Sequence, residues 1–219
     1  MWWAPRAACC ATKPALFRRP SFTPARRAAI LRAMSADSLP AFPLRPARVH
    51  EVCGAGARGF AAIAAAPMTR VLWLREAWLR ETLNPVGLSA FLDPARLLVA
   101  QAADQSDLLA VAEEALRDGA VPLVVLEISA ALDLREGRRL QLAAKAGGAT
   151  GLCLIPEGMG SNAAETRWQA MPIHDAQACD DSTLMRWDLI KNKSGTLGAW
   201  HVRWSTEARR LDLVSPAGE

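Results

Sequence analysis

Short apolar runs alternate with predicted helices through the middle of this 219-residue chain, and this alternation constrains the fold more than any other feature. The apolar runs span residues 71–74, 97–100, 122–127 and 151–155. Capping residues and an apolar stripe predict a helix that begins at Asp104 or Ser106 and ends at Gly119. A second helix is predicted over residues 133–146, and a short one over 59–66. Because uninterrupted apolar runs are typical of parallel strands, the pattern predicts an α/β fold with a mostly parallel sheet and helices on both faces.

The C-terminal part of the chain changes to a period of two. Apolar and polar residues alternate over residues 185–189 and 200–204, and turn residues lie between the two segments. This pattern predicts an antiparallel C-terminal extension of the sheet. Four tryptophans are expected mostly in its core: Trp168, Trp187, Trp200 and Trp204. The longest nearly uncharged apolar stretch, residues 60–68, is too short to cross a bilayer, which needs ~20 residues, so a membrane protein is excluded.

The charge of the chain is unevenly distributed. Residues 1–36 contain seven basic residues and no acidic one, which leaves nineteen basic and twenty-two acidic residues for the rest. The net charge of +4 therefore comes from the N-terminal segment and does not indicate nucleic-acid binding. Five prolines break residues 1–40, which predicts a disordered basic tail followed by one domain over 41–219. The tail is explained either as a transit peptide or as a wrongly assigned start codon, in which case translation begins at Met34.

Cysteine and histidine usage argues against a structural metal site. The five cysteines form no C-x-x-C pair, and the chain has three scattered histidines, so no ligand set for zinc is expected. Cys53 and Cys153 lie in apolar runs and are predicted to be buried thiols. The sequence is typical of a reduced, cytoplasmic protein.

A glycine-rich segment between a predicted strand (residues 48–53) and the helix over 59–66 has the layout of a phosphate-binding loop. Such a loop needs a lysine for the outer phosphates and a hydroxyl for Mg²⁺ directly after its last glycine. Here the lysine position is a phenylalanine and the hydroxyl position is an alanine. ATP and Mg²⁺ are therefore not expected as cofactors, and the glycines are explained as a tight turn. This degenerate loop comprises Gly54, Gly56, Gly59, Phe60 and Ala61.

Several stretches resemble the core of the RecA recombinase family in their order and spacing, and together they cover about residues 46–206. They are residues 48–54, 73–76, 97–101, 117–127 and 189–193. The resemblance implies that Glu76 stands at the catalytic glutamate and Glu127 at the metal-associated carboxylate. Both are also explained as solvated acids at strand ends, and Arg75 could pair with Glu76. The resemblance further implies that the Lys191, Asn192 and Lys193 segment faces a neighbouring subunit or a partner, although two lysines in a turn are also explained as solvated charge.

The points at which the sequence departs from RecA indicate which RecA-related family it resembles most. By comparison with RecA, the first DNA-binding loop is interpreted as deleted between residues 127 and 151, and the second as shortened between 155 and 168. A RecA-like core with these changes and a degenerate loop resembles the ImuA family of translesion-synthesis accessory proteins. The sequence is also similar to that family over residues 93–99, 138–148 and 160–168. The resemblance implies a DNA-damage-response protein that works with an ImuB-like member of the Y polymerase family, an error-prone replicative-type polymerase and RecA. Because Phe60 and Ala61 stand at the lysine and hydroxyl positions of the phosphate loop, the first hypothesis is a non-catalytic interaction protein.

A basic surface is predicted on the helix over residues 133–146. It comprises Arg135, Arg138, Arg139 and Lys145. An acidic partner or a DNA backbone fits it, as does a merely solvated helix face, and any DNA contact is expected to be indirect or weak. Two other functions remain open: a weak ATPase that acts as an oligomer, and a cell-division inhibitor resembling SulA. The sequence leaves the oligomeric state open.

Overall fold

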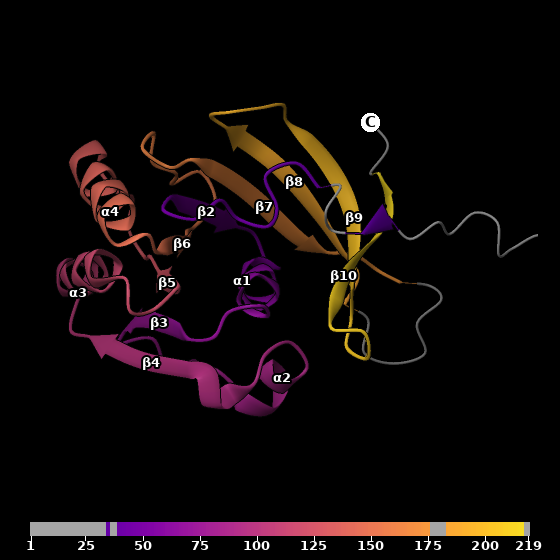
Figure 1. Cartoon of the computed structure of the whole chain (residues 1–219), viewed down its shortest axis with the longest axis horizontal. Helices are drawn as coiled ribbons and strands as arrows, with labels where there is room; N and C mark the ends of the chain where they lie inside the picture. Colours follow the sequence, from indigo (N-terminus) through magenta and orange to yellow (C-terminus); the bar gives the residue numbers. More distant parts are fainter. Residues whose placement is uncertain (1–33, 36–38, 176–182, 217–219) are drawn as a thin grey trace, which may run out of the picture. The chain divides into compact units, whose positions relative to one another are not determined.

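The computed structural model describes residues 34–35, 39–175 and 183–216, and these residues form one ten-stranded sheet (Figure 1). Six neighbouring strands are parallel: β7 (Thr166–Pro172), β2 (Val49–Cys53), β6 (Thr150–Leu154), β5 (Leu123–Glu127), β3 (Val71–Glu76) and β4 (Leu97–Ala102). Four antiparallel strands continue the sheet beyond β7: β8 (Met185–Asn192), β9 (Gly198–Ser205), β10 (Arg210–Pro216) and β1 (Met34–Ser35). The predicted mostly parallel sheet with an antiparallel C-terminal extension is confirmed.

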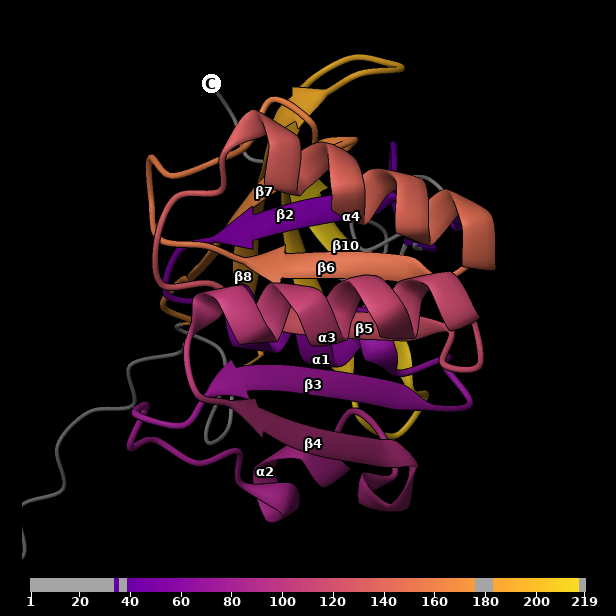
Figure 2. The same ribbon diagram turned by 90° about the vertical axis from the view of Figure 1, so that its left-hand side faces the viewer.

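Helices cover both faces of the parallel part, as predicted. Helix α1 (Ala57–Ala65) packs on one face, in a core that contains Phe60, Trp168 and Trp187. Helices α3 (Gln105–Asp118) and α4 (Leu134–Gly147) lie side by side on the other face (Figure 2). A short helix, α2 (Pro85–Ser89), and a 3₁₀ turn, η3 (Pro94–Arg96), connect β3 to β4.

The helix boundaries follow from local capping. Asp104 caps α3 by accepting a hydrogen bond from the Asp107 amide at 2.9 Å, and α4 begins with a reciprocal capping box between Asp133 and Glu136. Both helices end at a glycine in the left-handed conformation. Helix α1 begins at Ala57, two residues before its predicted start.

Two strands differ from what the sequence predicts. The uninterrupted apolar run of β4 is typical of a strand buried on both faces, but Leu98 and Val99 are 53% and 50% exposed. Strand β4 is the edge strand and pairs with β3 alone among the described residues, so its side chains lie at the margin of the sheet on both faces. Strand β7 was not predicted, because Arg167 and Gln169 interrupt its apolar residues.

The predicted boundary of the tail at residue 40 needs a correction. Met34 and Ser35 pair with β10, and Leu39 is buried. The rest of the predicted tail, residues 1–33 and 36–38, lies outside the described residues. Cys53 and Cys153 are buried free thiols, as predicted, and burial raises the pKa of each. In the described part of the chain, the helices are all too short or too polar to span a bilayer.

Candidate functional site

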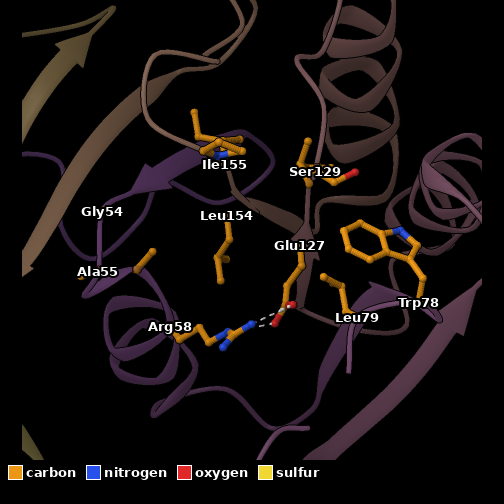
Figure 3. Close-up of a pocket in the computed structure, with 12 residues that line it drawn as sticks. Gly54, Ala55, Arg58, Trp78, Leu79, Glu127, Ser129, Leu154 and Ile155 are labelled. Atoms are coloured by element: carbon orange, nitrogen blue, oxygen red, sulfur yellow. Dashed lines mark hydrogen bonds and ion pairs between the residues drawn. The ribbon is translucent and has the colours of Figure 1, made fainter. Parts of the chain in front are cut away.

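The candidate site is a cavity of about 480 Å³ at the carboxyl-terminal ends of β2, β3, β5 and β6. The loop between β2 and α1 forms one side of it, and residues after the other three strands, including Trp78 and Ile155, form the rest (Figure 3). Ligands of α/β proteins bind at this edge of the sheet. The structure therefore places the predicted phosphate loop, residues 54–59, at the edge where such loops meet a nucleotide.

The glycines of this loop allow it to lie close to β7. Gly54 has φ +92°, and a Cβ atom at this position would lie 2.5 Å from the carbonyl oxygen of Ala170. The amide of Gly56 donates to that same oxygen at 2.8 Å, and the amide of Ala57 donates to the Gly54 carbonyl at 3.0 Å. A phosphate-binding loop needs its amides directed at the ligand. Here two of them hold the turn together instead.

Phe60 and Ala61 stand at the lysine and hydroxyl positions of the motif, and both are completely buried. The Phe60 ring lies 4.4 Å from the ring of Trp187, 5.5 Å from that of Trp168 and 5.7 Å from that of Phe42, measured between centroids. Phe60 does not line the cavity. The substitution has therefore turned a position of the phosphate motif into a position of the hydrophobic core.

Glu127 lies in the cavity wall, but its carboxylate is fully engaged by other side chains. Its oxygens accept hydrogen bonds from Trp73 Nε1 at 3.0 Å, from Arg75 Nη2 at 3.1 Å, and from Nε and Nη2 of Arg58, both at 3.3 Å. Figure 3 shows Arg58 reaching from α1 toward Glu127. Glu127 is only 7% exposed, so it is not a solvated strand-end acid.

Two arginines and two glutamates form an ion-pair cluster at this position: Arg58, Arg75, Glu81 and Glu127. The Arg75 guanidinium is 2% exposed and donates to the Glu81 carbonyl as well as to Glu127. Burial alone lowers the pKa of Arg58, but its hydrogen bond with Glu81 and the charge of Glu127 raise that pKa overall. The cluster has no net charge. A magnesium nucleotide does not fit these residues, because Glu81 and Glu127 together balance Arg58 and Arg75, and Glu127 has no oxygen left free for a metal ion.

Glu76 does not join Glu127 in this site. Alternation along β3 places Glu76 on the α3 face of the sheet, whereas Trp73 and Arg75 lie on the α1 face. Glu76 is 4% exposed, and its Oε2 atom has no hydrogen-bond partner in the described part of the chain. Arg75, which could have paired with Glu76, is paired with Glu127 instead.

The Lys191, Asn192 and Lys193 segment lies at the end of β8 and holds a neighbouring loop. Lys191 Nζ donates to the Ser161 carbonyl at 2.9 Å, and Lys193 Nζ donates to the Ala163 carbonyl at 2.6 Å. Burial lowers the pKa of Lys191, and the charge of Arg167 lowers it further. The Asn192 side chain accepts from the Ser194 amide at 3.1 Å and stabilises the turn. Both ammonium groups thus bind backbone carbonyls of residues 161–163.

The structure divides the predicted basic surface of α4. Arg139 pairs with Glu113 of α3 at 2.6 Å, on the side of α4 that faces α3. Arg138 and Lys145 line a second cavity of about 510 Å³ between α4 and residues 162–165, here called the α4 groove. Lys193 lines the same groove. Arg135 is exposed and does not line it. The groove thus brings together two features that lie apart in the sequence, the basic residues of α4 and the lysine segment at the end of β8.

Sequence reasoning missed a buried ion pair beside this groove. Glu51 of β2 is 1% exposed and accepts from Arg167 Nε at 2.7 Å and from the Ser161 amide at 2.8 Å. Arg167 belongs to β7, and without that strand no signal in the sequence connects it with Glu51. The pairing of Arg75 with Glu127 was also missed, although each ends an apolar run and the runs pair side by side.

The sequence matches no known protein family and no curated protein. The structure is similar to the crystal structure of the RadB recombinase, with a TM-score of 0.56 and 14% sequence identity over 76% of this chain and 90% of that chain. At this identity the likeness concerns the fold. The chain therefore has a RecA-like recombinase fold, as predicted, with a neutral ion-pair cluster beside its degenerate phosphate loop.

Proposed function

We propose that this chain is a non-catalytic RecA-like accessory protein of SOS-induced, error-prone translesion DNA synthesis. In this role it bridges an ImuB-like polymerase homologue, an error-prone replicative-type polymerase and RecA. The observation that carries the non-catalytic role is the ion-pair cluster of Arg58, Arg75, Glu81 and Glu127. The support for the pathway is the ImuA-like sequence of residues 138–148 and 160–168 on a RecA-like fold.

Phosphoryl transfer has three requirements that the residues of this chain do not meet. A transferring phosphoryl group needs a positioned cation, a magnesium ligand and a carboxylate that is free to act. In this chain the cation position is core phenylalanine, the hydroxyl position is buried alanine, and Glu127 is bound by two arginines and a tryptophan. We therefore propose that the chain uses no nucleotide cofactor.

The same role gives expectations for partners and compartment. Outside the first 36 residues the chain has more acidic than basic residues, so DNA contact is expected to be indirect or weak, through protein partners. The buried free thiols of Cys53 and Cys153 suit a reducing compartment, and we propose the cytoplasm.

The biochemical test measures nucleotide binding and turnover with the full chain. ATP and Mg²⁺ are titrated by calorimetry, and phosphate release is followed with and without single-stranded DNA. We expect no saturable binding at millimolar ATP and no release above buffer. Titrations at protein concentrations that favour self-association cover the oligomeric ATPase, in which Lys191 or Lys193 acts on a neighbour's nucleotide. Turnover that the Glu127→Gln variant abolishes would show that the proposal is wrong.

The genetic test separates the accessory role from a role in cell division. The gene is deleted in its host, and cells are exposed to a DNA-damaging agent. We expect the frequency of damage-induced mutation to fall and cell length after damage to stay unchanged. An unchanged mutation frequency together with a loss of filamentation would instead favour the SulA-like inhibitor and overturn the proposal.

A further inference from the structure

The α4 groove combines cations and exposed leucines in one concave surface. Its walls include four basic side chains and two leucines: Arg48, Arg138, Lys145, Lys193, Leu134 and Leu142. Leu134 and Leu142 are 48% and 68% exposed. Together with Arg138 they recur every four residues along α4, so they form one stripe on the helix. A leucine that exposes two thirds of its surface, beside cations that have no ion pair in the described ranges, indicates a surface that a partner covers.

The groove is held rigidly on both sides. On the α4 side, Gln141 donates to the Val49 carbonyl at 2.9 Å and to the Ala163 carbonyl at 3.1 Å, and it accepts from the Val49 amide at 3.2 Å. On the loop side, Lys191 and Lys193 hold the backbone of residues 161–163. A surface that is fixed before binding loses little conformational entropy when a partner docks.

The positive charge of the groove is only partly compensated. Glu165, the acidic residue in its wall, lies 3.7 Å from Arg48 and 3.4 Å from Arg45. Arg138 and Lys145 have no ion pair within the described residues, whereas Arg139, one position along the same helix, is paired with Glu113. The groove therefore offers two cations without an ion pair in the described part of the chain, with an exposed leucine between them.

We propose that the α4 groove docks an acidic, leucine-containing helical segment of a protein partner, an inference that rests on the proposed role as an accessory protein. Acidic side chains of such a segment meet Arg138 and Lys145, and its leucines cover Leu134 and Leu142. Among the described residues no aromatic side chain lines the groove, and two of its exposed side chains are leucines. Nucleic-acid surfaces are instead rich in basic residues and stacking rings, so these observations favour a peptide.

The test selects the ligand without assuming its identity. Phage-displayed random peptides, long enough for four helical turns, are selected on the full wild-type chain and counter-selected on an Arg138→Glu/Lys145→Glu variant. We expect the surviving peptides to carry Asp or Glu and Leu at helical spacing. The best peptide, synthesised and labelled, is expected to bind the double variant and a Leu142→Asp variant at least about tenfold more weakly than wild type. Arg135→Glu, on the same helix but outside the groove, is the matched control and is expected to leave binding unchanged.

Three outcomes would overturn the inference: no peptide that depends on the groove, selected peptides without acidic residues, or equal binding to wild type and the double variant. A labelled thymidine oligonucleotide forms a second arm. If it binds wild type and the double variant loses this binding while no peptide is selected, the groove is a nucleic-acid site and the inference is wrong. Circular dichroism of each variant checks that the fold is intact. Failure here, with no ATP turnover, leaves the non-catalytic role standing.

Discussion

The cavity at the phosphate loop and the α4 groove both have basic side chains in or beside their walls, but these charges are balanced by acidic residues in the first and largely unbalanced in the second. At the loop, Arg58 and Arg75 converge on Glu127, and the cluster is neutral. In the groove, Arg138 and Lys145 have no acidic partner among the described residues. A region whose charges are balanced internally does not attract an anion. A region whose positive charges are left unbalanced attracts an acidic partner.

At the loop, positions of a phosphate-binding motif contribute to the packing of the fold. Gly54 and Gly56 lie against β7, and Phe60 packs against three aromatic rings. In the groove, by contrast, Leu134 and Leu142 are 48% and 68% exposed and have no such packing constraint. Mutations should therefore affect stability at the loop and binding at the groove.

The largest effect is expected from Phe60→Lys, which restores the lysine of the motif. It removes a fully buried ring and puts an ammonium group into the aromatic core, so we expect a loss of about 5 kcal/mol in the free energy of unfolding. Urea denaturation followed by tryptophan fluorescence measures it. Phe60→Leu is the control, with a smaller loss. A stable lysine variant that gains ATP binding would contradict our account of the loop.

Glu127→Ala is expected to have the next largest effect. It leaves the buried Arg75 guanidinium without its ionic partner, and breaking a buried pair in this way costs about 3–5 kcal/mol. Denaturation in urea measures the loss. Glu81→Gln changes an exposed member of the same cluster and should cost much less. If the two variants lose equal stability, Glu127 does not organise the cluster.

Gly54→Ala tests whether the loop is fixed by its approach to β7. A Cβ atom there would lie 2.5 Å from the Ala170 carbonyl and would require a positive φ, so we expect a loss of about 2 kcal/mol. Gly158→Ala is a matched control, because Gly158 also has a positive φ, of +80°, but has no atom within 4 Å of the added Cβ. Thermal unfolding of both variants separates crowding from backbone strain. Equal losses would mean that the approach to β7 is not tight.

The pH dependence of stability distinguishes the two regions, because His50 lies beside the groove and no described histidine lines the loop cavity. His50 bonds Thr166 Oγ1 at 2.7 Å and the Arg45 carbonyl at 2.9 Å, and burial lowers its pKa below the usual 6.5. The unfolded chain therefore binds a proton first, so stability should fall as the pH drops below 6.5, toward the folded pKa.

For one proton this loss cannot exceed about 1.4 kcal/mol per pH unit. Urea denaturation between neutral and mildly acidic pH measures the slope. His50→Gln should flatten it, whereas His174→Gln, which changes an exposed histidine, should leave it unchanged. A slope that His50→Gln does not alter would remove His50 as its source.

The smallest effect on stability is expected in the groove. Arg138→Glu and Lys145→Glu remove no ion pair among the described residues, so each should change the free energy of unfolding by less than about 0.5 kcal/mol. Urea denaturation of the double variant checks this. A large loss would mean that these cations stabilise the fold, and the contrast between the two regions would disappear.

Much of the fold was predictable from the sequence, because the apolar runs and the capping residues Asp104 and Asp133 are local signals. The location of β4 at the sheet edge and the existence of β7 were not predictable in this way. Both depend on which strands pair across the whole chain. In β7, polar residues such as Arg167 interrupt the apolar pattern, and the partner of Arg167, Glu51, is more than a hundred residues away in the sequence.

The site was predictable in its location but not in its chemistry. The glycine spacing indicated the loop, and Phe60 and Ala61 indicated the lost cation and hydroxyl. That Glu127 is occupied by Arg58 and Arg75 depends on the register of β3 and β5 and on the position of α1, neither of which a single sequence gives. The α4 groove likewise arises where α4 meets the end of β8.

The aromatic packing of Phe60 has a consequence for how this sequence can evolve. A complete phosphate-binding motif would require a lysine at position 60, a hydroxyl at 61 and a Glu127 released from its arginines. The first and last of these changes are expected to lower stability, and a domain has only about 5–15 kcal/mol in total. A sequence that acquires the motif one substitution at a time would therefore need stabilising changes elsewhere to remain folded on the way.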